Sequence, residues 1–327
     1  MIPIRRRLVG SGLALLVLSP SASRIALAQP REVRIGYLAA RQNSLFLAPI
    51  LKRLGELGYV EGKNLILDYR SADGVAERFP SLARDMIRAK CDLIIAAGPV
   101  QSARAVLEAK ADVPLVIIAP DYDPVKAGIV ASLRRPGGNV TGMVLLPPSL
   151  TAKRLELLRE VVPKAKRILV LADAFTTDQL ETVQQAAGTL RVEIVVETFA
   201  APPYDFEAAF ARGVAAGAEV LIVLVSPVFL DQRARIAEQV MKYRVPSVGF
   251  PPHREDARFL LSYGTNFEKA VVRAGDIAVS ILKGAKAGDI PVEQPTEFEL
   301  VVDLKTAKAL KISIPPSIML RANRVIE

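Results

Sequence analysis

Two runs of alternating strand and helix patterns, separated by Pro147 and Pro148, constrain the fold of this 327-residue chain most. Before the prolines, short runs rich in Val and Ile alternate with segments whose apolar residues recur at helical spacing. The strands predicted there are Val33 to Leu38, Asn64 to Tyr69, Asp92 to Ala97, Pro114 to Ala119 and Asn139 to Leu145. The helices predicted between them are Leu45 to Leu57, Ala76 to Ala89 and Val100 to Ala109. This alternation favours a parallel sheet with helices on both faces.

The same pattern restarts after the prolines, where Ser149 can cap a helix that ends near Pro163. The strands predicted next are Arg167 to Leu171, Val192 to Thr198, Glu219 to Val225, Pro246 to Phe250 and Phe259 to Tyr263. The helices are Thr177 to Leu190, Tyr204 to Ala216, Val228 to Tyr243 and Asn266 to Lys283. The remaining strand, Glu297 to Asp303, and helix, Leu304 to Leu310, are too short for a third domain. We therefore expect an α/β chain of two doubly wound parallel-sheet lobes.

The N-terminus has the three parts of a secretory signal peptide. Three arginines at 5–7 precede a short apolar run from Leu8 to Leu18, and Ala26 to Ala28 forms a small-x-small cleavage site. The apolar run is shorter than the roughly 20 residues that a membrane helix needs. We expect cleavage after Ala28 by the general or the twin-arginine export route, and a free periplasmic protein that begins at Gln29.

Composition limits the classes of partner. The formal net charge of +9 falls to +5 without the signal peptide, which carries four arginines and no acid, so little favours nucleic acid. Hydrophobic residues make up 51% of the chain, which suffices for two cores. The single cysteine, Cys91, excludes an internal disulfide, and its place before a predicted strand favours a buried filler over a reactive thiol. We expect a monomer.

Catalytic and cofactor motifs do not occur. His253 is the only histidine, so neither a histidine-rich metal site nor a relay of histidines can form. The segment Gly58 to Asn64 resembles a phosphate-binding loop but has one residue too few between its glycines and precedes a predicted strand. The mature chain also lacks the G-x-S-x-G and G-x-G-x-x-G patterns. We expect no enzyme, metal or cofactor.

A ligand site is expected in the loops that follow the predicted strands, because open parallel sheets bind ligands at the carboxyl ends of their strands. The first lobe supplies Arg41, Gln42, Asn43, Gly98, Pro99, Val100, Gln101, Asp121, Tyr122 and Asp123. The second lobe supplies Asp173, Phe175, Ser226, Pro227, Phe250 and Tyr263.

These residue types favour a small carboxylated solute, either an amino acid or an aromatic acid. A carboxylate such as Asp123 can accept charge-assisted hydrogen bonds from an ammonium group. The helix that begins after Gly98 offers free N–H groups to a carboxylate. Structural alternatives remain: Asp123 precedes a proline and can cap a turn, Asp173 can be structural, and Phe175 and Phe250 can belong to the core.

Several segments carry a resemblance to a known family. The longest reads D-P-V-K-A-G-I-V-A-S-L-R-R-P-G-G-N-V-T-G, from Asp123 to Gly142. The others are Ile35 to Leu38, Leu57 to Leu65, Lys153 to Pro163, Ile281 to Leu310 and Ile314 to Ser317. Together they resemble substrate-binding proteins of ABC transporters, which are type I periplasmic binding proteins with relatives that bind tryptophan and phenylalanine. The resemblance covers nearly all of residues 32 to 327.

The resemblance implies three hinge crossings, near Leu145, Tyr263 and Glu297. We therefore expect residues 29–145 with 264–296 in lobe 1, and residues 146–263 with 297–327 in lobe 2. It also implies a protein that closes on a solute and delivers it to the membrane subunits of an ABC permease. Alternatives are a ligand-sensing module for a membrane receptor and a two-lobed α/β enzyme, while the export signal disfavours a repressor.

Overall fold

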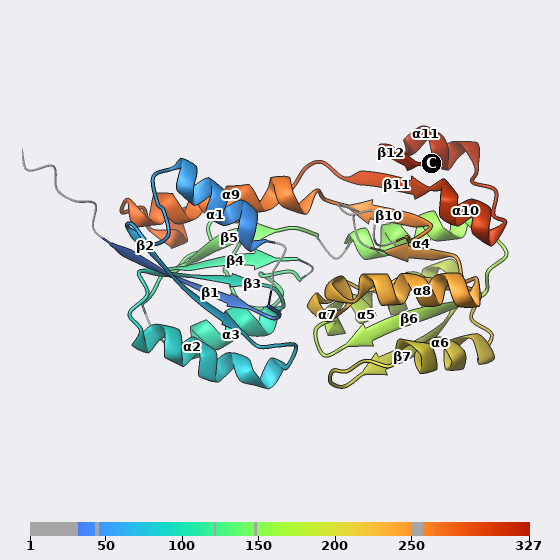
Figure 1. The fold of residues 1–327 in the computed structure, drawn as a ribbon, viewed down its shortest axis with the longest axis horizontal. Helices are drawn as coiled ribbons and strands as arrows, with labels where there is room; N and C mark the ends of the chain where they lie inside the picture. The colour runs from blue at the N-terminus through green and yellow to red at the C-terminus, as the bar shows by residue number, and fades with distance from the viewer. Residues whose placement is uncertain (1–31, 43–45, 111, 121, 147–148, 250–257) are drawn as a thin grey trace, which may run out of the picture. The chain divides into compact units, whose positions relative to one another are not determined.

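A computed structural model describes residues 32–42, 46–110, 112–120, 122–146, 149–249 and 258–327 of the chain. The expected α/β architecture is confirmed, with two separate sheets (Figure 1). The first sheet has five parallel strands in the order β2-β1-β3-β4-β5. Their bounds are β1 Val33–Ala39, β2 Leu65–Ser71, β3 Leu93–Ala97, β4 Leu115–Ala119 and β5 Val140–Val144.

Helices cover both faces of this first sheet (Figure 1). Helices α1 (Leu47–Glu56) and α9 (Phe267–Leu282) pack together on one face, and α2 (Phe79–Arg88) and α3 (Val100–Glu108) pack together on the other. An ion pair joins α1 to α9, with 2.7 Å between Arg53 Nε and Asp276 Oδ1. Strands β3, β4 and β5 are buried throughout, which explains their continuous apolar sequences.

Gly142 allows β4 and β5 to pair closely. Its φ is +141°, and a Cβ at this position would lie 2.0 Å from the carbonyl oxygen of Ile117 on β4. Only glycine can occupy such a position, because no neighbouring backbone atom can move far enough.

The second sheet has seven strands in the order β12-β11-β10-β9-β8-β6-β7. Their bounds are β6 Arg167–Asp173, β7 Glu193–Phe199, β8 Val220–Val223, β9 Ser247–Gly249, β10 Leu261–Gly264, β11 Glu299–Asp303 and β12 Arg324–Ile326. All neighbouring strands pair in parallel except β10 with β11. The helices are α4 Ser149–Val161, α5 Thr177–Leu190, α6 Phe206–Ala215, α7 Pro227–Asp231, α8 Arg233–Tyr243, α10 Leu304–Leu310 and α11 Pro316–Arg321.

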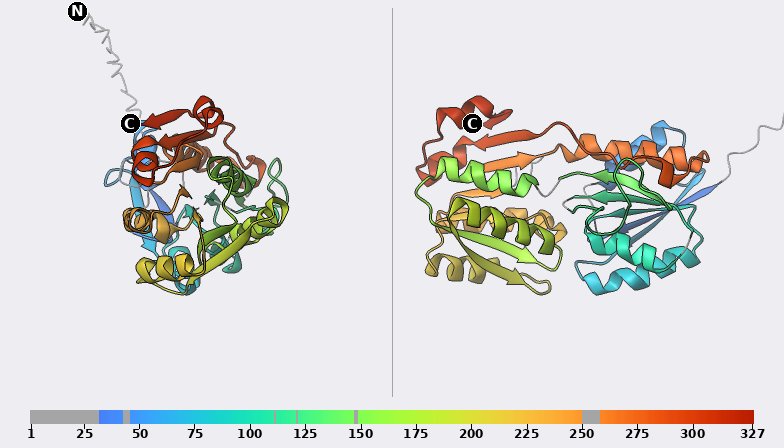
Figure 2. Two further views of the ribbon diagram at one scale, coloured as in Figure 1. Left: turned by 90° about the vertical axis from the view of Figure 1, so that its right-hand side faces the viewer. Right: turned by 180° about the vertical axis from the view of Figure 1, so that it is seen from behind.

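The side chains of β6 show how this sheet is doubly wound. Ile168 and Val170 belong to one core cluster, with residues of α4 and α5, whereas Leu169 and Leu171 belong to another, with residues of α6 and α8. Alternate residues of a strand point to opposite faces. The two helix pairs therefore cover opposite faces of the sheet, which is also visible in Figure 2.

The chain passes between the sheets near Leu145, near Tyr263 and again before β11. Helix α9 packs on α1 in the first sheet, although β10 before it and β11 after it belong to the second. A hydrogen bond joins the connections near Leu145 and Tyr263, in which the Thr265 hydroxyl donates to the Leu145 carbonyl at 2.8 Å. The residue limits of the two lobes stay a prediction.

The local predictions failed at two places. The helix predicted over Val228 to Tyr243 is two helices, α7 and α8, divided at Gln232, whose φ and ψ of −101° and 16° are not helical. The sequence analysis assigned no element to the tail, which forms α11 and β12.

No helix within the described ranges is long and apolar enough to cross a membrane.

Candidate ligand-binding site

The two sheets each have a switch point, where successive crossovers of the chain turn in opposite directions along the sheet. In the first sheet it lies between β1 and β3, and in the second between β6 and β8. Open α/β sheets bind ligands at this place, outside the carboxyl ends of the strands. The loops concerned follow Ala39, Ala97, Asp173 and Val223, and they supply most of the residues predicted from the sequence.

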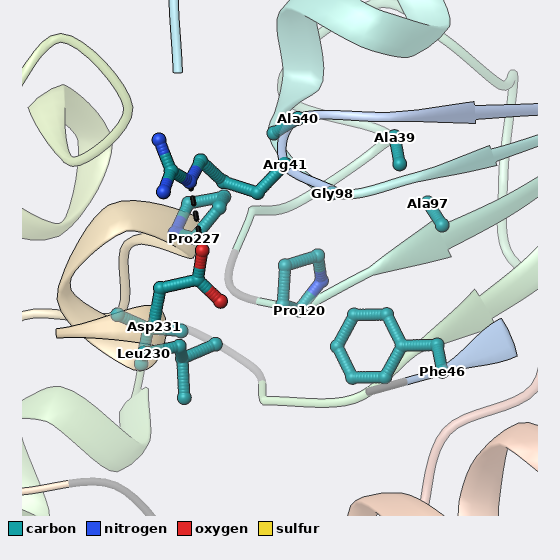
Figure 3. A pocket seen from close by; sticks show the side chains of 11 residues that line it. Ala39, Ala40, Arg41, Phe46, Ala97, Gly98, Pro120, Pro227, Leu230 and Asp231 are labelled. Carbon is teal, nitrogen blue, oxygen red and sulfur yellow. Dashed lines mark hydrogen bonds and ion pairs between the residues drawn. The ribbon is translucent and has the colours of Figure 1, made fainter. Parts of the chain in front are cut away.

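Loops from both switch points line a first cavity, with about 470 Å³ of empty volume that includes open solvent (Figure 3). The lining residues are Ala39, Ala40, Arg41, Phe46, Ala97, Gly98, Pro120, Val225, Pro227, Leu230 and Asp231. The small alanines and Gly98 leave room beside the ring of Phe46, and most of the wall is apolar. Such a cavity suits a ligand with a compact apolar body and few polar groups.

Two charged residues belong to this lining, and they pair with each other. The Arg41 Nε atom donates to Asp231 Oδ2 at 2.8 Å, from the loop after β1 to the end of α7 (Figure 3). The two side chains are 29% and 34% exposed. Among the described residues, the lining of this cavity therefore holds one cation and one anion against an apolar wall.

A second cavity, with about 540 Å³ of empty volume that includes open solvent, lies beside α3 and α5. It is lined by Val100, Gln101, Arg104, Tyr122, Phe175, Thr177, Asp178 and Gln179. The amide nitrogen of Gln101 donates to the Ala174 carbonyl at 3.1 Å, which joins the two switch-point loops directly. The amide oxygen of Gln101 is buried and has no hydrogen-bond partner among the described residues. It is therefore available to a donor group in this more polar part of the cleft.

Asp173 is buried at the end of β6 and bonded on both oxygens. Its Oδ1 accepts from the Phe175 N–H at 2.9 Å, and its Oδ2 accepts from the hydroxyls of Tyr204 and Ser226. Burial raises the pKa of Asp173 from 3.8 to about 6, although these hydrogen bonds lower it. The Ser226 hydroxyl oxygen in turn accepts from the Val228 N–H at 3.1 Å and caps α7. Asp173 thus fixes the start of the helix that forms part of the first cavity.

Asp123 lies in the loop after β4 and caps a turn. Its Oδ1 accepts from the N–H groups of Val125 at 2.8 Å and Lys126 at 3.2 Å. This geometry favours the turn-capping alternative, so the ligand-binding role of Asp123 stays a prediction with weaker support.

The other predicted residues divide into three groups. Arg41, Gly98 and Pro227 line the first cavity, and Val100, Gln101, Tyr122 and Phe175 line the second. Pro99 is the N-cap of α3, Gln42 is exposed, and the ring of Tyr263 packs against Phe298 with 6.2 Å between centroids. Neither cavity includes Tyr263 in its lining. Asn43, Asp121 and Phe250 lie outside the described residues.

Several lining residues were not predicted from the sequence, above all Asp231. The sequence pattern predicted a single long helix there. One signal was present, because Ser226 and Pro227 mark a helix start and Asp231 follows Pro227 by four residues on the same helical face. The structure also adds Phe46, Pro120, Val225, Leu230, Arg104, Asp178 and Gln179 to the candidate site. No group of three metal-binding side chains gathers within the ranges that the structure describes.

The two doubly wound lobes have the fold of type I periplasmic binding proteins. The family model for ABC transporter substrate binding proteins matches residues 45–326, and the chain belongs to this family. It is a family of solute-binding proteins.

Individual proteins are also similar to this chain in sequence or in fold. A tyrosine-binding protein of Clostridioides difficile is 29% identical over 264 residues, which cover 80% of this chain and 74% of the relative. A conserved domain protein from Vibrio cholerae has a TM-score of 0.81 at 24% identity, over 90% of this chain and 100% of its own. An ABC domain from Streptococcus pneumonia in complex with L-Trp has a TM-score of 0.75, with the same identity and coverage. These two structures show the fold.

Proposed function

We propose that this chain is the periplasmic solute-binding component of an ABC importer, and that it binds a small carboxylated solute between its two lobes. The observation that carries the proposal is the first cavity, whose wall comes from both switch points and whose described residues include one cation and one anion. The solute is an amino acid or an aromatic acid. This class agrees with the tyrosine and L-Trp named for the similar proteins.

Delivery to a permease requires that the solute stabilises one arrangement of the lobes. Residues from both lobes line each cavity, so a solute there contacts both and favours the closed form. The permease membrane subunits would then recognise the closed monomer. No bond of the solute needs to break in this cycle.

Thermal unfolding in the presence of single amino acids and aromatic acids tests the binding role. A ligand at one hundred times its dissociation constant should add about 2.7 kcal/mol to the free energy of unfolding. Ala97→Leu should abolish this shift, because Ala97 lines the cavity and a larger side chain fills it. Ala103→Leu is the matched control, since Ala103 is buried in α3 outside either lining. A ligand-dependent shift that survives Ala97→Leu unchanged would place the solute elsewhere.

The periplasmic location rests on residues 1–28, which lie outside the described residues. Their charged, apolar and small-residue parts support cleavage after Ala28. Mass spectrometry of the exported protein should find Gln29 at the N-terminus. A full-length chain retained in the membrane fraction would contradict export as a free protein.

A further inference from the structure

Contacts other than their ion pair fix the positions of Arg41 and Asp231. The Arg41 carbonyl accepts from the Tyr69 hydroxyl at 2.8 Å, and its guanidinium also donates to the Asp73 carbonyl at 3.4 Å. Asp231 ends a short helix whose first turn is capped by Ser226. The two charges therefore occupy fixed places on opposite sides of the cleft.

Within the part of the chain that the structure describes, the rest of the wall of the first cavity gives these charges few other partners. Most of the residues around them are Ala, Gly, Pro, Val, Leu and Phe. A charged group that loses water in such surroundings requires a partner of opposite charge. A solute that enters must therefore either leave the ion pair intact or replace each half of it.

We propose that Asp231 is a specificity-determining residue of this site, and that together with Arg41 it selects a zwitterion. This inference rests on the proposed solute-binding function. The solute carboxylate pairs with the Arg41 guanidinium and the solute ammonium pairs with the Asp231 carboxylate. On binding, the protein thus loses one internal ion pair and gains two ion pairs with the solute.

The charge balance distinguishes three kinds of solute. A monocarboxylate takes Arg41 and leaves Asp231 unpaired, an amine takes Asp231 and leaves Arg41 unpaired, and a zwitterion leaves both paired. The two side chains are about one-third exposed, so water screens part of the difference. We therefore expect discrimination of up to about fivefold, rather than the larger factors of fully desolvated pairs.

Two acids that were predicted from the sequence are poorer partners for the ammonium than Asp231. Asp173 accepts hydrogen bonds from the protein on both oxygens, and Asp123 uses one oxygen to cap its turn. An ammonium at Asp173 would have to displace buried hydroxyl donors. Asp231 needs only to exchange one cation for another.

Calorimetry with three probes tests the inference. The probes are L-phenylalanine, 3-phenylpropionate, which lacks the ammonium, and 2-phenylethylamine, which lacks the carboxylate. The parent protein should bind L-phenylalanine up to about fivefold more tightly than either analogue. Asp231→Asn should bring the ratio of L-phenylalanine to 3-phenylpropionate close to one. It should also tighten the binding of 3-phenylpropionate itself, because Arg41 is then free of its competitor.

Arg41→Gln should show the complementary change, a lost preference for L-phenylalanine over 2-phenylethylamine. Glu181→Gln is the matched control. Glu181 also pairs across the cleft, with Lys126 at 3.4 Å, but lines neither cavity. It should change the affinities of all three probes by one common factor, as expected for a residue that affects closure alone.

The outcomes separate this inference from the function on which it rests. An unchanged affinity ratio in Asp231→Asn, or the same ratio change in Glu181→Gln, overturns the role of Asp231. If other compounds of the wider screen bind and none of the three probes does, the zwitterion selection is overturned and the binding function stands. If no compound of the wider screen binds, both fall together.

Discussion

Replacing Asp173 with Asn removes a carboxyl group that is 4% exposed and has a pKa near 6. Burial is the largest cause of the raised pKa, and the hydrogen bonds from Ser226, the Phe175 N–H and Tyr204 offset part of it. The difference between about 6 and the ordinary value of 3.8, at 1.36 kcal/mol for each pH unit, corresponds to about 3 kcal/mol.

The sign follows from proton binding in the two states. Between pH 3.8 and about 6 the folded protein binds the Asp173 proton more tightly than the unfolded chain does. The contribution of this group to stability is therefore complete below pH 3.8, falls as the pH rises through 6 and is absent above it. The amide of the Asp173→Asn variant does not titrate and has no such dependence. The free energy of unfolding of Asp173→Asn, relative to the parent, should thus rise by about 2–3 kcal/mol between pH 4 and pH 7.5.

Urea unfolding at a series of pH values measures this difference in free energy of unfolding. Hydrogen bonds that the variant loses equally at every pH shift all the values together and do not change the slope against pH. Ser226→Ala provides a matched test that keeps the carboxyl group. The Ser226 hydrogen bond lowers the pKa of Asp173, so its removal should move the upper end of the window above pH 6. A relative stability of Asp173→Asn that stays flat from pH 4 to pH 7.5 would refute the reasoning.

Three further predictions concern the backbone and the cysteine. Gly74→Ala and Gly62→Ala both force alanine to a positive φ, which should lower the free energy of unfolding by about 1–2 kcal/mol in each variant. Only Gly74→Ala should also weaken solute binding in calorimetry, because its methyl group would lie 3.2 Å from Pro202 of the other lobe. Gly142→Ala should lower the free energy of unfolding in urea by more than about 4 kcal/mol, against the small loss in Gly62→Ala. Burial raises the pKa of Cys91 to about 11 from 9.0, so iodoacetamide at pH 8 should alkylate the native protein at least about a hundredfold more slowly than the unfolded chain, as followed by mass spectrometry. Equal ligand affinity in the two glycine variants, a stable Gly142→Ala or rapid alkylation would contradict the respective argument.

The sequence predicted the fold well because buried parallel strands have continuous apolar sequences. The run from Leu115 to Ala119 is one such strand, and its ends were predicted to within one residue. Turn residues at Gly137 and Gly138 placed the start of β5 correctly. These signals are local, so a single sequence contains them.

The candidate site was less predictable because the role of each side chain depends on distant residues. Phe175 follows β6 as expected and lines the second cavity, yet Tyr263 also ends a strand and packs against Phe298 instead. Strand order decides which strand ends meet the cleft. The order along the chain does not supply it, since β6 lies between β8 and β7, and β9 separates β10 from the switch point.

Three acids near the cleft show why composition alone does not identify a ligand partner. Asp173 is the last residue of β6, Asp123 follows β4 and Asp231 is the last residue of α7, and the first two were predicted from position alone. What separates them is the group that each one already binds. Hydroxyl and amide donors fixed by the fold hold Asp173 and Asp123. The donors at Asp173 are buried, and a buried donor left without an acceptor costs about 1–3 kcal/mol. Asp231 pairs with a partly exposed cation, whose loss costs about 1 kcal/mol or less and which a solute carboxylate can satisfy in its place. Exchange at low cost therefore makes Asp231, rather than the more deeply buried Asp173, the acid that a solute can use.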